Sequence, residues 1–357
     1  MDGSMLSKIE CRDPAAQRRM ALEVPGRGRQ RRCAMKRIRV FFTLLVALVP
    51  IAGGAAPVDW PTKPVRIIVP FPPGQGADII ARLLSERFSD EFGQRFIVEN
   101  RPGAGSMLGT AQAAKAPADG YTLLIGGTSA MVINPFLFAD AGYDTLRDFA
   151  PISNVASLPM VILVRRSLPV SSIGELIQYA KAHPGKLTYG SAGNGSSHHL
   201  VMARFARMAG IDIRHVPYKG SAAAMTDLLG DNIDLLSDTL PAVTPNVTAG
   251  KVRALAISSR SRSPFMPDLP TLDESGLKGF DVTAWSGLLA PRQTPPEILD
   301  RLNAATVKAL NQPDVRQRFK ELSMSIIGDS RQDFERFIRE ELERWKVEVK
   351  SSGAKVD

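Results

Sequence analysis

The chain has 357 residues, of which 44% are hydrophobic and 23% are charged, a composition typical of a globular protein with room for two hydrophobic cores. Its formal charge of +9 would suit a nucleic-acid ligand, but residues 1–56 alone carry +7, from 11 Lys and Arg against 4 Asp and Glu. The remainder carries +2 and has no stripe of basic residues with interleaved aromatic residues. We therefore expect no nucleic-acid partner.

Residues 35–56 have the three regions of a secretory signal peptide. Basic residues lie between Met35 and Arg39, an apolar run extends from Val40 to Ile51, and small residues continue to Ala56. The apolar run is shorter than the roughly 20 residues that span a bilayer, so a permanent anchor is the weaker interpretation. We expect cleavage near Ala56 and export to the periplasm.

The 34 residues that precede this segment are polar and rich in arginine. Since a signal peptide begins at the start of a chain, we infer that translation begins at Met35 and that residues 1–34 are not native to the protein. The alternative is a disordered basic extension that is retained. Both cysteines, Cys11 and Cys33, lie before the expected cleavage point. The mature chain would therefore have neither a disulfide nor a cysteine that could carry a lipid anchor.

Short apolar runs alternate with helical patterns along the mature chain, which predicts an α/β fold. The expected strands are Val65–Pro70, Phe96–Glu99, Tyr121–Ile125, Met160–Val164, Leu187–Gly190, Ile213–Pro217, Ile233–Ser237, Arg253–Ser258 and Ser286–Ala290. The strands from residue 187 onward suggest a second, smaller sheet. Amphipathic helices are predicted at Asp78–Phe92, Pro296–Leu310 and Asp333–Val349, because their apolar residues recur at three-to-four spacing.

Two glycine-containing loops could hold an anion. Phe71–Asp78 joins the first strand to a helix, and Gly190–His199 joins a later strand to another helix. Glycines let backbone amides turn inward, and the following helix contributes its partial positive end. A single glycine-containing loop of this kind can equally well serve only to connect a strand to a helix, without binding a ligand. Two such loops, one from each lobe, predict a ligand held from both sides, such as a dicarboxylate or an amino acid.

The sequence gives little support to an enzyme. Gly103–Gly109 has the spacing Gly-x-Gly-x-x-x-Gly, which differs from the dinucleotide-binding fingerprint, and no Gly-x-Ser-x-Gly nucleophile motif occurs. His198 and His199 are adjacent, so on a helix their side chains diverge by about 100 degrees and are poorly placed to share a metal. A hydrogen-bonding role for one of them is the better interpretation. We expect no catalytic residues, no metal and no cofactor.

Several motifs resemble those of the Bug family of tripartite tricarboxylate transporter receptors. They are Trp60-Pro61-x-Lys63-Pro64-Val65-Arg66, the Pro-Phe-Pro-Pro-Gly loop from Pro70 to Gly74, Glu99–Gly105, Asp119-Gly120-Tyr121, Val216–Gly220 and Pro270-Thr271-Leu272. These blocks occur in the family's order and spacing from about residue 58 to the end of the chain. The resemblance implies a type II periplasmic binding protein, with two α/β lobes that close on a solute like a Venus flytrap. It places one lobe at 57–158 plus 284–357 and the other at 159–283.

By the same resemblance, one wall of the ligand site would comprise Phe71, Pro72, Gly74, Gln75, Gly76, Asp78, Thr128, Ser129 and Asn134. The other wall would comprise Ser191, Gly193, Asn194, Gly195, Ser196, His199, Tyr218 and Asp238. Gln75 stands where the family usually has glycine, and Ala77 where it often has threonine, so ligand choice could differ. Asp238 could pair with a ligand ammonium group or cap a turn.

The resemblance implies a monomeric receptor that passes a small organic carboxylate to the membrane permease subunits of a tripartite transporter. The carboxylate could be a dicarboxylate, a tricarboxylate, an acidic amino acid or an aromatic acid. A receptor that presents its liganded form to a signalling partner is the alternative, because lobe closure would serve both roles.

Overall fold

A computed structural model describes residues 59–352 of the chain. The predicted signal peptide, the start at Met35 and both cysteines lie outside these residues. These described residues belong to one compact unit. Among the described residues, no helix has the length and apolar content needed to cross a membrane.

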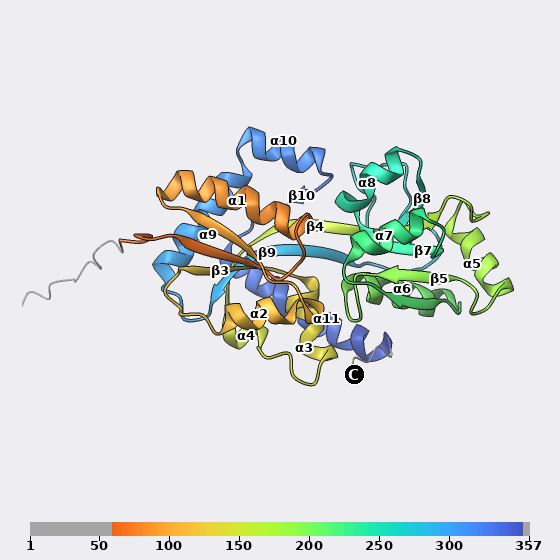
Figure 1. Cartoon of the computed structure of the whole chain (residues 1–357), viewed down its shortest axis with the longest axis horizontal. Helices are drawn as coiled ribbons and strands as arrows, with labels where there is room; N and C mark the ends of the chain where they lie inside the picture. Colours follow the sequence, from red (N-terminus) through yellow and green to blue (C-terminus); the bar gives the residue numbers. More distant parts are fainter. Residues whose placement is uncertain (1–58, 353–357) are drawn as a thin grey trace, which may run out of the picture. The chain divides into compact units, whose positions relative to one another are not determined.

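A first ladder of strands contains β1 (Val65–Val69), β2 (Phe96–Asn100), β3 (Thr122–Gly127) and β9 (Thr283–Pro291). β2, β1 and β3 are parallel, and β9 runs antiparallel to β3. The helices α1 (Gly76–Phe92) and α2 (Met107–Ala114) lie on opposite faces of these strands (Figure 1). Because helices cover both faces, the strands are nearly continuous apolar runs, as in Val65–Val69.

A second ladder contains β5 (Thr188–Ser191), β6 (Arg214–Pro217), β7 (Leu235–Thr239) and β8 (Val252–Ile257). β5 is parallel to β6 and β7. The helices around this ladder are α5 (Ile173–Ala182), α6 (Ser197–Ala209), α7 (Ser221–Leu229) and α8 (Leu240–Thr248).

One long strand, β4 (Phe149–Arg165), belongs to both ladders. Its residues Phe149–Pro159 pair with β9, and Met160–Val164 pair with β7. The strand order is therefore continuous, β2-β1-β3-β9-β4-β7-β5-β6, with β8 and the short β10 (Ser325–Ile326) also pairing with β4. The expected second sheet is thus joined to the first, because β4 is 17 residues long and not only the predicted Met160–Val164. The change of partner falls near the predicted lobe boundary, and the division into domains stays a prediction.

The directions of the strands determine where their ends lie. β4 is antiparallel to β9, which is antiparallel to β3, so β1, β3 and β4 run the same way. β7 is antiparallel to β4, so β5 and β7 run back toward the first ladder. The carboxyl ends of β1 and β3 therefore face the carboxyl ends of β5 and β7. In open α/β sheets this is the edge at which ligands bind.

The carboxyl-terminal part of the chain covers the first ladder. α9 (Pro296–Leu310) has the predicted bounds, and α11 (Arg331–Ser352) extends the predicted helix at both ends. α11 buries Phe334, Ile338, Leu342, Trp345 and Val349 on one stripe, as its sequence pattern predicts. The remaining described elements are η1 (Ala104–Ser106), the π-helical turn η2 (Ser129–Ile133), α3 (Asn134–Leu137), α4 (Thr145–Asp148) and α10 (Pro313–Glu321).

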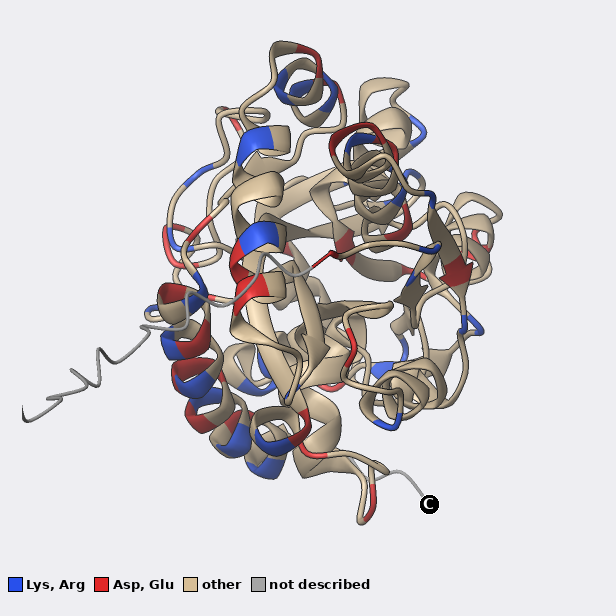
Figure 2. Cartoon of the chain, turned by 90° about the vertical axis from the view of Figure 1, so that its left-hand side faces the viewer, with Lys and Arg blue, Asp and Glu red and all other residues tan. Residues whose placement is uncertain are grey.

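Acidic and basic residues alternate over the part of the chain turned toward the viewer in Figure 2. The mixture is densest on one helix with closely spaced charges of both signs (Figure 2). On α11, ion pairs such as Arg339–Glu335 form between residues one turn apart. This distribution agrees with the small net charge expected beyond residue 56.

Candidate functional site

Loops from the two ladders contact each other at the facing strand ends. The Ser197 backbone N–H, at the start of α6, donates to Ser129 Oγ at 3.1 Å. A Cβ atom at Gly220, just before α7, would lie 3.7 Å from Pro72 Cγ and 3.8 Å from Gln75 Nε2. The two sets of loops predicted from the sequence are therefore brought together. That these residues contact a ligand stays a prediction.

The β1–α1 loop is held by Asp78. Its Oδ2 accepts from the Gly74 N–H at 2.9 Å, its Oδ1 accepts from Asn100 Nδ2 at 2.9 Å, and Arg82 donates to both oxygens at 3.0 Å. Burial raises the pKa of Asp78, but the bonds from Arg82, Gly74 and Asn100 outweigh it and leave the pKa below its ordinary value. The carboxylate of Asp78 is thus occupied within its own loop.

The start of α1 leaves its first amides uncapped. Gln75 is the N-cap residue with extended backbone angles, and its side chain makes no capping hydrogen bond. α7 likewise begins after Gly220 without a side-chain cap. A Cβ atom built on Gly220 would lie 3.8 Å from the Gln75 side-chain amide nitrogen, so this amide lies close to the start of α7. A side-chain N–H donor and a partly positive helix end therefore lie near each other, an arrangement suited to an anion.

The residues after β3 have structural bonds of their own. Thr128 Oγ1 accepts from the Trp285 N–H at 3.0 Å, which ties the end of β3 to β9. The buried Asn134 side chain donates through Nδ2 to Gly105 O at 2.8 Å. The Phe71 ring lies 3.4 Å from where a Cβ atom of Gly127 would be. These contacts fix the first wall of the predicted site.

The β5–α6 loop is folded by hydroxyl and imidazole groups. Ser196 caps α6 by accepting from the His199 N–H at 3.3 Å, and it donates to Gly193 O at 2.7 Å. His199 Nδ1 accepts from the Gly195 N–H at 3.2 Å. Gly195 has φ of 73°, a left-handed backbone conformation that glycine adopts without strain. Asn194 is the exposed tip of the loop.

Two histidines stack beside this loop. The rings of His199 and His215 are parallel, with centroids 3.9 Å apart, and Tyr189 stacks on His215 at 4.9 Å. His215 Nε2 lies 2.6 Å from Ser191 Oγ. Burial lowers the pKa of His199 to about 4, and burial together with His199 lowers the pKa of His215 to about 4. Both rings are therefore neutral near pH 7.

Tyr218 and Asp238 are engaged inside the second ladder. The Tyr218 hydroxyl donates to Asp227 Oδ2 at 2.6 Å, and burial and this bond raise the pKa of Tyr218 to about 12. Asp238 is buried, and its Oδ1 accepts from the Thr239 N–H at 2.7 Å and lies 2.9 Å from His198 Nε2. His198 is thus the partner that Asp238 finds in the folded chain.

Sequence reasoning missed three supporting residues. Arg82 carried a signal, because it lies four residues after Asp78 on the predicted helix. Asn100 and His215 carried none, since they come from distant parts of the chain and meet their partners only through the fold. A hydrogen bond was expected for one of His198 and His199, but its partner Asp238 was not.

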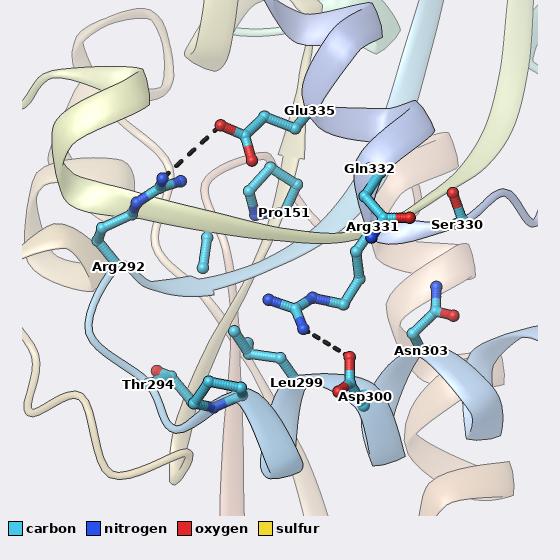
Figure 3. Close-up of a pocket in the computed structure, with 12 residues that line it drawn as sticks. Pro151, Arg292, Thr294, Leu299, Asp300, Asn303, Ser330, Arg331, Gln332 and Glu335 are labelled. Atoms are coloured by element: carbon cyan, nitrogen blue, oxygen red, sulfur yellow. Dashed lines mark hydrogen bonds and ion pairs between the residues drawn. The ribbon is translucent and has the colours of Figure 1, made fainter.

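A hollow of about 400 Å³ lies elsewhere, where β4 begins and β9 ends (Figure 3). This is the opposite end of the strands from the contacting loops. Its two arginines are each paired with an acid: Arg292 with Glu335 at 3.7 Å, and Arg331 with Asp300 at 2.5 Å. None of its lining residues belongs to the predicted ligand site. Within residues 59–352, no cluster of three or more His, Cys, Asp or Glu is placed to hold a metal ion.

Two α/β ladders joined by the shared strand β4, with loops that lead into helices at the facing strand ends, define a periplasmic binding protein. The sequence profile described as the tripartite tricarboxylate transporter family receptor matches residues 80–353. The chain belongs to this family, which is one of transporter receptors and not of enzymes. A curated relative is BugT of Bordetella pertussis, 37% identical over 322 residues that cover 88% of this chain and 99% of BugT.

Solved structures agree with this assignment. Rpa4515 of R. palustris with adipate has a TM-score of 0.80 at 38% identity and covers 84% of this chain and 100% of its own. The periplasmic binding protein BugD has a TM-score of 0.77 at 35% identity, with 83% and 99% covered. MatC from Rhodopseudomonas palustris with bound malate has a TM-score of 0.76 at 33% identity, with 81% and 99% covered. The expected Bug-family resemblance and fold are therefore confirmed.

Proposed function

We propose that this protein captures a small dicarboxylate between its two ladders and delivers it to the membrane permease subunits of a tripartite transporter. The observation that carries the proposal is the approach of the Gln75 side-chain amide, at the uncapped start of α1, to Gly220, at the uncapped start of α7. A carboxylate there would accept hydrogen bonds from free backbone amides of both helices. Relatives solved with adipate and with malate support the choice of a dicarboxylate.

In this proposed site, uncharged groups supply most of the hydrogen bonds to the ligand. The acids and histidines nearest the loops are already engaged, Asp78 by its own loop and Asp238 by His198. A ligand would therefore be recognised through backbone amides, the Gln75 amide and the hydroxyl group of Ser129, because the Ser196 hydroxyl already donates to Gly193 O. Such groups bind a carboxylate without a paired cation when the surrounding dipoles are fixed in place.

Calorimetry with adipate, malate, citrate, glutamate and nicotinate tests the ligand class. We expect one of the dicarboxylates to bind and a neutral sugar such as glucose to give no heat. Gln75→Ala should weaken binding about tenfold through loss of one hydrogen bond to a charged group. Gln112→Ala, an exposed amide on α2, is the matched control. Binding of the sugar alone would contradict the proposal.

We further propose that the chain reaches the periplasm by a signal peptide at residues 35–56, with cleavage near Ala56 and translation from Met35. The basic, apolar and small-residue regions of that segment support this, and so does membership of a periplasmic receptor family. Sequencing the amino terminus of the exported protein is the test, and a mature start far from Ala56 or Pro57 would refute it.

A further inference from the structure

The last helix connects the first ladder to the second. Near its start, Phe334 packs against β9 so closely that a Cβ atom on Gly287 would lie 2.2 Å from its ring. Near its end, Glu348 accepts from Arg204 Nη1 at 2.8 Å and from Arg207 Nη2 at 3.2 Å, both on α6. In Figure 1 the carboxyl end of α11 lies beneath the helices of the second ladder. A single helix is thus fixed to both ladders.

Arg204 also holds the segment that leads into β9. Its Nη2 donates to Gly279 O at 2.9 Å, and its guanidinium lies 5.0 Å from the centre of the buried Phe280 ring. β9 pairs with β4 from Phe149 to Pro159, up to the point where β4 passes into the second ladder. Arg204, which lies on α6, therefore contacts both α11 and the segment that precedes β9.

The ion pair is sheltered from water. The side chains of Arg204 and Glu348 are only 15% and 17% exposed, whereas Arg207 is 45% exposed. Exposed ion pairs contribute little because water screens them and their side chains are mobile. A sheltered pair with further hydrogen bonds and a stacked ring keeps one geometry. It can therefore fix the relative position of the elements that carry it.

We propose that Glu348, Arg204 and Arg207 form a clamp that positions the second ladder against the first and so prolongs ligand retention. The clamp bonds exist in the same conformation as the hydrogen bond from the Ser197 N–H to Ser129 Oγ, which joins loops of the two ladders. Interactions made in one conformation shift the population toward it. The effect on retention rests on the proposed ligand capture, whereas the effect on ladder position does not.

The test separates these two effects. In the full chain with Cys11→Ser and Cys33→Ser, spin labels are placed through Gln112→Cys on α2 and Lys251→Cys before β8, both exposed positions. Distances between the labels are measured by pulsed electron resonance without ligand, and adipate and malate dissociation by stopped flow. Glu348→Gln is compared with Glu343→Gln, an exposed glutamate on the same helix.

We expect Glu348→Gln to broaden the distance distribution and to speed dissociation about fivefold, while Glu343→Gln matches the parent. A lower melting temperature with unchanged distances would overturn the clamp and leave a structural role. If Glu348→Gln does not fold, the same spin-label distances are measured in Arg207→Gln, which changes an exposed member of the clamp and should also broaden the distribution. If neither acid binds, the proposed ligand class fails, and the distances still decide the clamp.

Discussion

Replacing Asp78 by asparagine tests how the β1–α1 loop is held. The carboxylate is 3% exposed and accepts four hydrogen bonds, from Gly74, from Asn100 and twice from Arg82. In Asp78→Asn, an amide NH₂ group would face at least one of these donors, and the charge opposite Arg82 would be lost. Hydrogen bonds to charged groups contribute about 1.5–3 kcal/mol each.

The Arg82 side chain is 56% exposed and can be rehydrated, so we expect a total cost of about 2–3 kcal/mol. For a chain of this size that corresponds to a fall in melting temperature of about 4–6 °C. Because the pKa of Asp78 lies below its ordinary value of 3.8, this stabilisation is complete above pH 3.8 and is lost as the pH falls through the folded value.

Thermal unfolding followed by circular dichroism at pH 7 is the assay. Asp90→Asn is the control, since Asp90 lies on the same helix with its side chain 73% exposed. It should shift stability by no more than about 0.5 kcal/mol. Equal melting temperatures for the two variants would refute the argument that Asp78 holds the loop.

Two further predictions concern the stacked histidines and the packing of α11. Because burial lowers the pKa of His199 and His215 to about 4 from an ordinary 6.5, the unfolded chain takes up these protons first, and stability should fall as the pH drops from 6.5 to 4. The double variant His199→Gln, His215→Gln should flatten this fall in melting temperature, and the exposed His183→Gln should not; equal slopes would contradict the assignment. Gly287→Ala should destabilise by about 1–3 kcal/mol in urea unfolding, since its new methyl group would overlap the Phe334 ring. Gly174→Ala, whose Cβ atom would meet only Ser172 Oγ at 3.9 Å, is the control, and a comparable loss in both would show that close packing is not the cause.

The apolar pattern of the sequence predicted several helices and strands. α9 and α11 were found from their apolar stripes, and β1 and β2 within a residue of their bounds. The first half of β4 was missed, because Phe149–Pro159 mixes proline, serine and asparagine with apolar residues. Pairing with β9 along that whole stretch is what makes it a strand, and such pairing is not encoded locally.

For the site, the loops were predictable and their internal bonds were not. Glycines and helix starts indicated Phe71–Asp78 and Gly190–His199 as places where amides converge. The sequence did not show that Asp78 and Asp238 are satisfied within the protein, because Asn100 and His198 reach them from other elements. A carboxylate in a ligand-binding loop can stabilise that loop without contacting ligand.

The shared strand β4 limits where this chain could be cleaved and how its parts could be exchanged between related proteins. Seventeen residues supply an inner strand to both ladders, so a break between Pro159 and Met160 would expose unpaired edges on each fragment. Exposed edges of this kind promote aggregation. The two ladders are therefore not interchangeable modules. Recombination between relatives would have to exchange β4 together with the strands that pair with it, β7, β8, β9 and β10.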